Sequence, residues 1–313
     1  MNRPLPDGYT RRPASRDDID ALAALWRRSD ESLGVEPNSG ETFLRWILTL
    51  PFLLLDRDSV VVEHGGAPAA FAVAIRDPAS EGSAMEWFGM VDPAHLGRGV
   101  GGWLVTWADR VIEQRADERP FAVRSIGPAR DAAAHELLAK AGYAPVRTSW
   151  DMAIDVRAGV APPEPPDGVR VRTFQSGRDE RTFWQVAEAA FAEHFGFAAS
   201  PYESWEAAWY RSDSWDPSRV LLAEIDGDVV GELAWFDAGP DGYVASLGVL
   251  KLHRRRGIAS FLLRAAFADI AAAGFQRSTL SVDTENETGA LALYRSVGME
   301  PIREDRVFQR GDG

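Results

Sequence analysis

The apolar positions of this chain follow one series of spacings twice. In the first half, three- and four-residue spacing predicts helices at about residues 16–26 and 41–50, and apolar runs around a tight turn predict a two-stranded hairpin over residues 59–75. Strands and helices then alternate from residue 84 to residue 156. The hairpin pattern returns over residues 220–236, so the chain is predicted to hold two copies of one α/β unit.

The two copies keep the same internal distances. Landmarks recur at a near-constant interval, as the pairs Glu63 and Glu224, Val91 and Val249, and Gly142 and Gly298. Between the copies, residues 161–168 contain four prolines, which neither a helix nor the interior of a sheet would tolerate. We therefore expect one domain over residues 1–157, a proline-rich linker over residues 158–168 and a second domain over residues 169–313.

The composition is typical of a globular protein, with 45% hydrophobic and 26% charged residues. Cysteine is absent, which excludes disulfides, thiolate zinc sites and cysteine nucleophiles. The 5 histidines lack metal-ligand spacing, so no metal is implied. No apolar run is long enough to span a membrane, and the N-terminus has no apolar signal segment, so we expect a cytoplasmic location.

Positive charge is concentrated in one turn of an otherwise acidic chain. The net charge of -13 argues against nucleic acid as a partner, because duplex binding needs a broad basic face. Yet Arg254, Arg255 and Arg256 stand together between a predicted strand and a predicted helix, followed by the small residues Gly257 and Ala259. The N-terminus of a helix offers unpaired N–H groups and a positive dipole end. This turn is therefore predicted to bind an anion such as a pyrophosphate.

A related turn, His95 to Gly102, follows the corresponding strand of the first half. Together with the strand that ends in Val249, the turn Arg254 to Ala259 resembles motif A of the GNAT N-acetyltransferase superfamily. Asn286, Ala290, Tyr294 and Gly298 resemble its motif B. The resemblance covers essentially the whole chain, once in each half. The two-domain size and residues 190–196 also resemble the tandem actinobacterial acetyltransferases related to mycothiol synthase.

The resemblance implies an α/β (α+β) fold of two tandem GNAT domains, each a mixed, mostly antiparallel sheet flanked by helices. It also implies acetyl-CoA as the cosubstrate. In the second half, the residues implied to bind it are Leu247, Gly248, Val249, Arg254, Arg255, Arg256, Gly257, Ile258, Ala259, Asn286 and Tyr294. In the first half, they are Val91, Arg98, Gly99, Val100 and Gly101.

The resemblance assigns Tyr294 the role of a general acid that protonates the departing CoA thiolate. The alternative is that this side chain merely packs on a helix. Counting back from Gly142 by the same interval places Leu138 at the corresponding position of the first half, and leucine cannot donate a proton. We therefore expect chemistry in the second half, and a structural or ligand-holding role for the first.

The general base is not where many members of the superfamily have it. They place a glutamate four or six residues before the terminal valine of the motif A strand, and these positions are here Ala245 and Tyr243. The candidates that remain are Glu232, Asp283 and His194. Glu232 could instead face solvent, and His194 could cap or pack a helix end. A water relay, or an amine that arrives neutral, would also serve.

Together these observations predict transfer of acetyl from acetyl-CoA to a primary amine of a small molecule, by direct attack of the amine on the thioester. The alternatives are acetylation of a protein N-terminus or lysine, and a non-catalytic acyl-CoA-binding or sensing protein. Neither nucleic acid nor a membrane is expected as a partner. The oligomeric state, the amine and the acyl chain length stay undetermined by the sequence.

Overall fold

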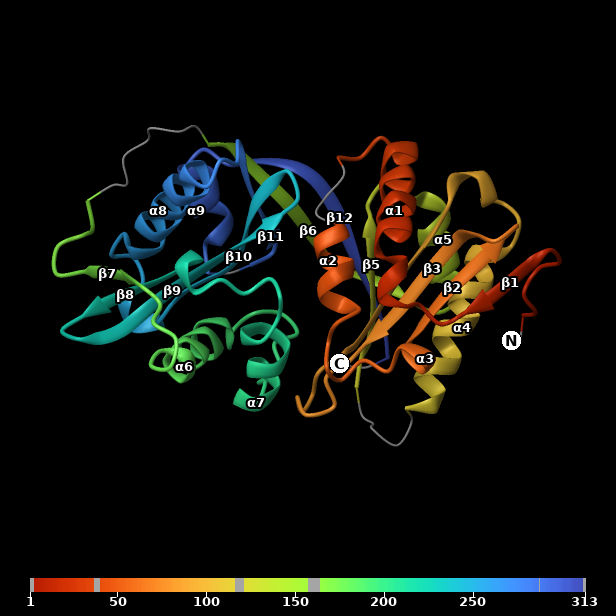
Figure 1. Cartoon of the computed structure of the whole chain (residues 1–313), viewed down its shortest axis with the longest axis horizontal. Coiled ribbons are helices and arrows are strands. Elements are labelled where there is room, and N and C mark those ends of the chain that lie inside the picture. The colour runs from red at the N-terminus through yellow and green to blue at the C-terminus, as the bar shows by residue number, and fades with distance from the viewer. Residues whose placement is uncertain (1–2, 37–39, 116–120, 157–163, 287, 312–313) are drawn as a thin grey trace. The chain divides into compact units, whose positions relative to one another are not determined.

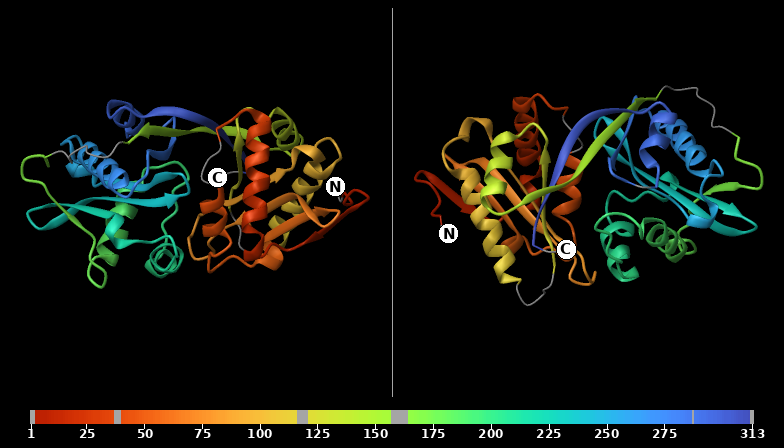
Figure 2. Two further views of the ribbon diagram at one scale, coloured as in Figure 1. Left: turned by 45° about the horizontal axis from the view of Figure 1, so that its top comes forward. Right: turned by 180° about the vertical axis from the view of Figure 1, so that it is seen from behind.

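The computed structural model describes residues 3–36, 40–115, 121–156, 164–286 and 288–311 (Figure 1). These residues form two compact units. Unit 1 comprises Met1–Ser149 with Arg303–Gly313, and unit 2 comprises Trp150–Ile302. Each unit is a sheet with helices on both faces (Figures 1 and 2).

Unit 1 contains a mixed sheet whose strands follow the order β1 (Tyr9–Arg12), β2 (Ser59–His64), β3 (Ala67–Ile75), β4 (Met85–Val91), β5 (Val123–Pro128) and β12 (Glu300–Arg310). The pairing of β4 with β5 is parallel, whereas the pairings β1–β2, β2–β3, β3–β4 and β5–β12 are antiparallel. The helices are α1 (Ile19–Leu33), α2 (Gly40–Ile47), α3 (Leu55–Asp58), α4 (Val100–Gln114) and α5 (Ala132–Lys140).

Unit 2 repeats this plan with the strand order β6 (Ala144–Asp155), β11 (Arg277–Asp283), β10 (Asp241–Val249), β9 (Asp228–Ala238), β8 (Val220–Ile225) and β7 (Arg170–Thr173). Its helices are α6 (Glu180–Phe191), α7 (Tyr202–Trp205), α8 (Ile258–Ala272) and α9 (Ala290–Ser296), with a π-helical turn over Glu206–Tyr210. Helices α6 and α7 lie on one face of this sheet, and α8 and α9 lie on the other (Figures 1 and 2).

The same ion pairs occur in both units and support the internal duplication. In unit 1, the Arg12 guanidinium contacts Asp18 at 2.6 Å and Glu63 at 2.9 Å. At the matching positions of unit 2, Arg172 contacts Asp179 and Glu224, each at 2.5 Å. Each arginine therefore ties the first strand of its unit to the start of the following helix. The predicted mixed, mostly antiparallel α/β fold is confirmed.

The two units differ from the predicted domain ranges at two long strands. Half of β6, from Trp150 on, lies in unit 2, although residues 1–157 were expected to form the first domain. Conversely, residues 305–310 of β12 pair with β5 in unit 1. Of the expected linker, residues 158–163 lie outside the described residues, and residues 164–168 lead into β7. Local sequence patterns identify a strand but not the sheet that it joins.

A buried ion pair fixes β12 in unit 1. The side chain of Arg303 is only 3% exposed, and its guanidinium lies 2.7 Å from Asp30 of α1 and 3.0 Å from Asp305. It also donates to the carbonyl oxygen of Glu36 at 3.2 Å. Two buried carboxylates thus depend on one cation that arrives from the far end of the sequence.

The last helix of unit 2 begins later than its sequence predicts. The residue pattern predicts a helix from Asn286 to Val297, whereas α9 begins at Ala290. The side chain of Asn286 accepts the Thr288 N–H at 2.7 Å and forms a turn, and Gly289 before the helix has a φ of 85°. Asn286 is therefore held in a loop at the end of β11.

We predict that Arg303→Met destabilises the protein by about 3–5 kcal/mol, because it leaves Asp30 and Asp305 buried without their cation. The measurement is urea unfolding of the full chain. The matched control is Arg306→Met, an exposed arginine on the same strand, for which a change below about 0.5 kcal/mol is expected. Equal effects of the two substitutions would contradict this role of the buried pair.

Candidate active site

The strands β10 and β11 part beside the basic turn. Among the described residues of these strands, the parallel pairing consists of Gly242 with Ser278 and Tyr243 with Thr279. A β-bulge between Val244 and Ser246 bends β10 at the same place, while its other edge stays paired with β9. The β11-facing edge of β10 therefore presents backbone polar groups that an extended ligand with amide groups can pair with.

Helix α8 begins where this open edge ends. Its N-cap, Gly257, has a φ of 81° and is exposed, and Arg255 also has a positive φ of 62°. This left-handed backbone turns the chain sharply from β10 into α8. The unpaired N–H groups of the first helical turn consequently lie at the end of the open strand. The predicted anion site is thus continuous with the strand edge.

The three arginines of the turn are not equivalent. Arg254 donates to the carbonyl oxygens of Val249 and Ala190, both at 3.1 Å, and pairs with Glu193 at 2.9 Å. It therefore ties the end of α6 to the end of β10. Arg255 and Arg256 are exposed, so their positive charge faces the solvent beside the helix N-terminus.

The predicted residues Leu247, Gly248 and Val249 form the last part of β10. Gly248 lies so close to its neighbours that a Cβ added there would be 2.6 Å from Glu232 Oε1 and 2.8 Å from Ala190 Cβ. A side chain at this position would displace either the carboxyl or α6. Glycine is therefore required for Glu232 and the strand edge to share this region.

Glu232 lies in the middle of β9 and is completely buried, at 0% exposure, so the interpretation as a solvent-facing residue is wrong. Ser246 Oγ donates to Glu232 Oε1 at 2.8 Å, and the Gly248 N–H also donates to this carboxyl group. Its Oε2 has no hydrogen-bond partner among the described residues. Burial raises the pKa of the Glu232 carboxyl to about 8.

Tyr294 lies on α9 and packs against the core of unit 2. Burial, followed by the neighbouring Tyr243 and Glu232, raises the pKa of its phenol to about 12. Tyr243 and Glu232 are thus each within electrostatic range of the Tyr294 phenol. Tyr294 therefore keeps its proton throughout the neutral pH range.

His194 follows α6, and its Nε2 lies 3.5 Å from the side-chain nitrogen of Asn286. Burial, and then the positive charge of Arg254, lower the pKa of the imidazole. A neutral imidazole thus stands beside the predicted cofactor residue Asn286. The third candidate, Asp283, accepts the Glu285 N–H at 2.9 Å and so stabilises the turn after β11.

Sequence reasoning missed Ser246, Ser281 and Asp151. Ser246 reaches Glu232 because of the bulge, for which the sequence carries no signal. Asp151 bonds to Ser281 of β11, although it was expected in the other domain. Because this part of β6 belongs to unit 2, the Asp151 carboxylate lies beside β11 and one strand away from β10, the strand that lacks the usual glutamate.

Unit 1 keeps the turn but not the acid. Gly99 caps α4 with a φ of 87°, Arg98 precedes it, Val100 and Gly101 begin the helix, and Val91 ends β4. The guanidinium of Arg3, however, occupies the space that a side chain at Gly102 would need. Leu138 is buried at the position that corresponds to Tyr294.

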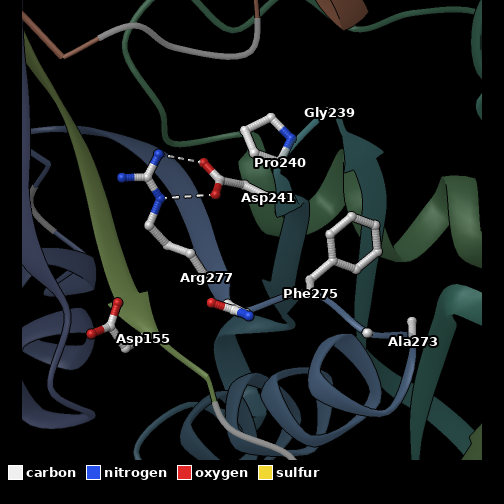
Figure 3. A pocket seen from close by; sticks show the side chains of 9 residues that line it. Asp155, Gly239, Pro240, Asp241, Ala273, Phe275 and Arg277 are labelled. Carbon is white, nitrogen blue, oxygen red and sulfur yellow. Dashed lines mark hydrogen bonds and ion pairs between the residues drawn. The ribbon is translucent and has the colours of Figure 1, made fainter.

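A separate pocket of unit 2 lies at the other end of β10 (Figure 3). Its volume is about 650 Å³, and Arg277 and Asp241 form an ion pair at 2.8 Å in its wall. Asp155 of β6 also lines this pocket. Because Asp241 begins the strand that Val249 ends, this pocket is not the candidate active site.

Comparison with known proteins identifies the family. The family model described as acetyltransferase (GNAT) family matches residues 20–143 and again residues 183–299. The chain belongs to the GNAT acetyltransferase family. The predicted acetyltransferase activity and the tandem arrangement are confirmed.

No helix among the described residues has both the length and the apolar composition to cross a membrane.

Similar proteins span nearly the whole chain. A protein of Thermobispora bispora named mycothiol acetyltransferase is 30% identical over 306 residues, which cover 94% of this chain and 96% of that protein. A crystal structure of a GCN5-related N-acetyltransferase from Sphaerobacter thermophilus is 32% identical, with a TM-score of 0.82, and covers 98% of this chain and 96% of that chain. A tandem GNAT protein of the clavulanic acid biosynthesis pathway, 14% identical with a TM-score of 0.69, covers 97% of this chain and 99% of its own and shares the fold.

We predict that Glu232→Gln removes a pH dependence from the stability of the protein. The folded pKa of about 8 exceeds the ordinary value of 4.5, so the folded state binds the proton more tightly. Wild-type stability relative to the variant is therefore greatest below pH 4.5 and falls by about 1.4 kcal/mol per unit until about pH 8.

The measurement is urea unfolding of both proteins between pH 5 and pH 8. The variant should become progressively more stable than the wild type as the pH rises. Glu300→Gln, at an exposed position, serves as the control and should follow the wild type. Parallel curves for wild type and Glu232→Gln would contradict a buried carboxyl with a raised pKa.

Proposed function

We propose that this acetyltransferase transfers acetyl from acetyl-CoA to a primary amine of a small molecule, and that unit 2 carries the chemistry. The observation that carries the proposal is that β10 parts from β11 and leads into the N-terminus of α8, with Tyr294 and Glu232 within electrostatic range of each other. Relatives named mycothiol acetyltransferase, similar over nearly their whole length, support a small-molecule acceptor.

The features of unit 2 fit acetyl-CoA. The open edge of β10, from Leu247 to Val249, can pair with the amides of the pantetheine arm. The first turn of α8 can bind the pyrophosphate, with positive charge from Arg255 and Arg256. Arg254, in contrast, positions the turn through its bonds to Val249, Ala190 and Glu193.

The amine must lose a proton before or during its attack on the thioester carbonyl. Glu232 is a candidate to accept it, because a pKa of about 8 lies close to the neutral range in which a general base is effective, and the ionised fraction of this carboxyl can take the proton. Its Oε2 has no hydrogen-bond partner among the described residues and can accept one. His194, neutral and next to Asn286, is the second candidate for the same proton.

Collapse of the tetrahedral intermediate breaks the carbon–sulfur bond and releases a thiolate. Tyr294 is suited to protonate it, because the phenol is still protonated at neutral pH. Unit 1 has Leu138 at this position and contributes no proton. We therefore assign the catalytic steps to unit 2, and a structural or ligand-holding role to unit 1.

We predict that Tyr294→Phe lowers kcat by about 10²- to 10⁴-fold, the range for loss of a general acid, with an unchanged KM for acetyl-CoA. The assay is release of free CoA in the presence of a panel of small primary amines and of peptides with free N-termini. Tyr202→Phe, an aromatic substitution on α7, is the control and should retain wild-type rates.

Equal rates in wild type and Tyr294→Phe would remove this residue from the mechanism. Acetylation of the peptides but not of the small amines would contradict the small-molecule acceptor. Acetyl-CoA binding without turnover of any amine would favour a binding or sensing protein instead.

A further inference from the structure

Three polar side chains form a row across neighbouring strands of unit 2. Gly242 of β10 faces α8, because a Cβ added there would be 2.5 Å from Ile270. Tyr243 therefore points to the opposite face of the sheet, where α6 packs. Ser281 lies two residues after Thr279, the register partner of Tyr243, and so points to this same face. The row crosses the point at which β10 and β11 part.

Strand β6 completes the row with a carboxylate. Asp151 follows Trp150 and precedes Met152, whose side chain is buried in the core on the α8 side of the sheet. Its own side chain consequently points to the α6 face, where Ser281 Oγ bonds to its Oδ1. Tyr243 in turn bonds to the side chain and to the backbone of Ser281.

The hydrogen bonds of this row have a defined direction. An ionised carboxylate can only accept, so Ser281 must donate its single hydroxyl proton to Asp151. Tyr243 must then donate to Ser281 Oγ, while its oxygen accepts the Ser281 backbone N–H. The lone pair that is left on the Tyr243 oxygen can only accept a further donor, such as an N–H group.

The row ends at the reacting groups. Tyr243 and Glu232 both lie within electrostatic range of the Tyr294 phenol, so the acceptor and the proposed acid and base belong to one region of unit 2. Asp151 gives its far end a negative charge. Position 243 is one of those where many members of the superfamily have a glutamate. Here it carries a phenol, which the Asp151 carboxylate of β6 polarises through Ser281 of β11.

We propose that the row Asp151–Ser281–Tyr243 binds the amine of the acceptor substrate and makes unit 2 selective for cationic amines over neutral hydroxyl compounds. The inference rests on the proposed function and names the group that recognises the acceptor. It also means that the site is incomplete without β6. The first half of the sequence therefore supplies Asp151 to the active site of the second.

The test is Asp151→Asn in the full chain. An asparagine can donate to Ser281, which then directs its proton to Tyr243 and removes the acceptor from the site. We expect KM for the amine to rise about 10- to 100-fold, the effect of losing a hydrogen bond to a charged group, with kcat and the KM for acetyl-CoA unchanged. Asp155→Asn, at an exposed carboxylate on the same strand and face, is the matched control and should behave as the wild type.

A second readout separates recognition from structure. Glucosamine and phenethylamine are compared with glucose and phenylethanol, their hydroxyl counterparts, as ligands that protect the protein against thermal unfolding. Wild type and Asp155→Asn should prefer the amines, whereas Asp151→Asn should lose this preference. An unchanged preference, or equal effects of the two asparagine substitutions on KM, would overturn the proposal.

A third readout does not depend on turnover. Burial, and to a smaller extent the charge of Asp151, raise the pKa of the Tyr243 phenol, so Asp151→Asn should lower this pKa in a titration followed by NMR of ¹³Cζ-labelled tyrosine. If no amine is acetylated but this shift occurs, the proposed function fails while the row stands. If amines are acetylated but the Tyr243 signal is unmoved, the row fails while the proposed function stands.

Discussion

The site depends on the parting of β10 from β11 after Tyr243. Had the parallel ladder continued, the backbone groups of Leu247 to Val249 would pair with β11 and no ligand could reach them. The bulge after Val244 bends β10 away and turns Ser246 toward Glu232. The N-terminus of α8 lies at the end of the same strand. The bulge thus leaves the β11-facing edge of β10 unpaired and also places Ser246 beside Glu232.

Much of this arrangement could be predicted from the sequence. The duplication, the glycine N-caps of both turns and the position of Tyr294 follow from spacing and residue type, which are local properties. The strand with which a given strand pairs can lie far away in the sequence. For this reason the sequence did not reveal that β6 extends into unit 2 and β12 into unit 1. For the same reason, neither the complete burial of Glu232 nor the bond between Asp151 and Ser281 was predictable.

Electrostatics divides the site into two regions. Exposed Arg255 and Arg256 at the helix N-terminus favour an anionic cofactor. On the α6 side of β10, Asp151 supplies a carboxylate that complements a cationic amine, and Glu232 supplies a buried carboxyl that can take a proton from it. Arg254 and Glu193 pair between the two regions and hold α6 beside β10. The anionic cofactor therefore faces the arginines at the α8 N-terminus, and the cationic acceptor faces the carboxyl groups on the α6 side of β10.

The most direct test of this account is calorimetric titration of acetyl-CoA into the wild type, Gly257→Glu and Gly99→Glu. Both substitutions put a negative charge and the same backbone strain at an N-cap glycine, one in each unit. The account predicts that binding to the unit 2 site is lost in Gly257→Glu and retained in Gly99→Glu. Undiminished binding by Gly257→Glu, or no binding by the wild type, would contradict it.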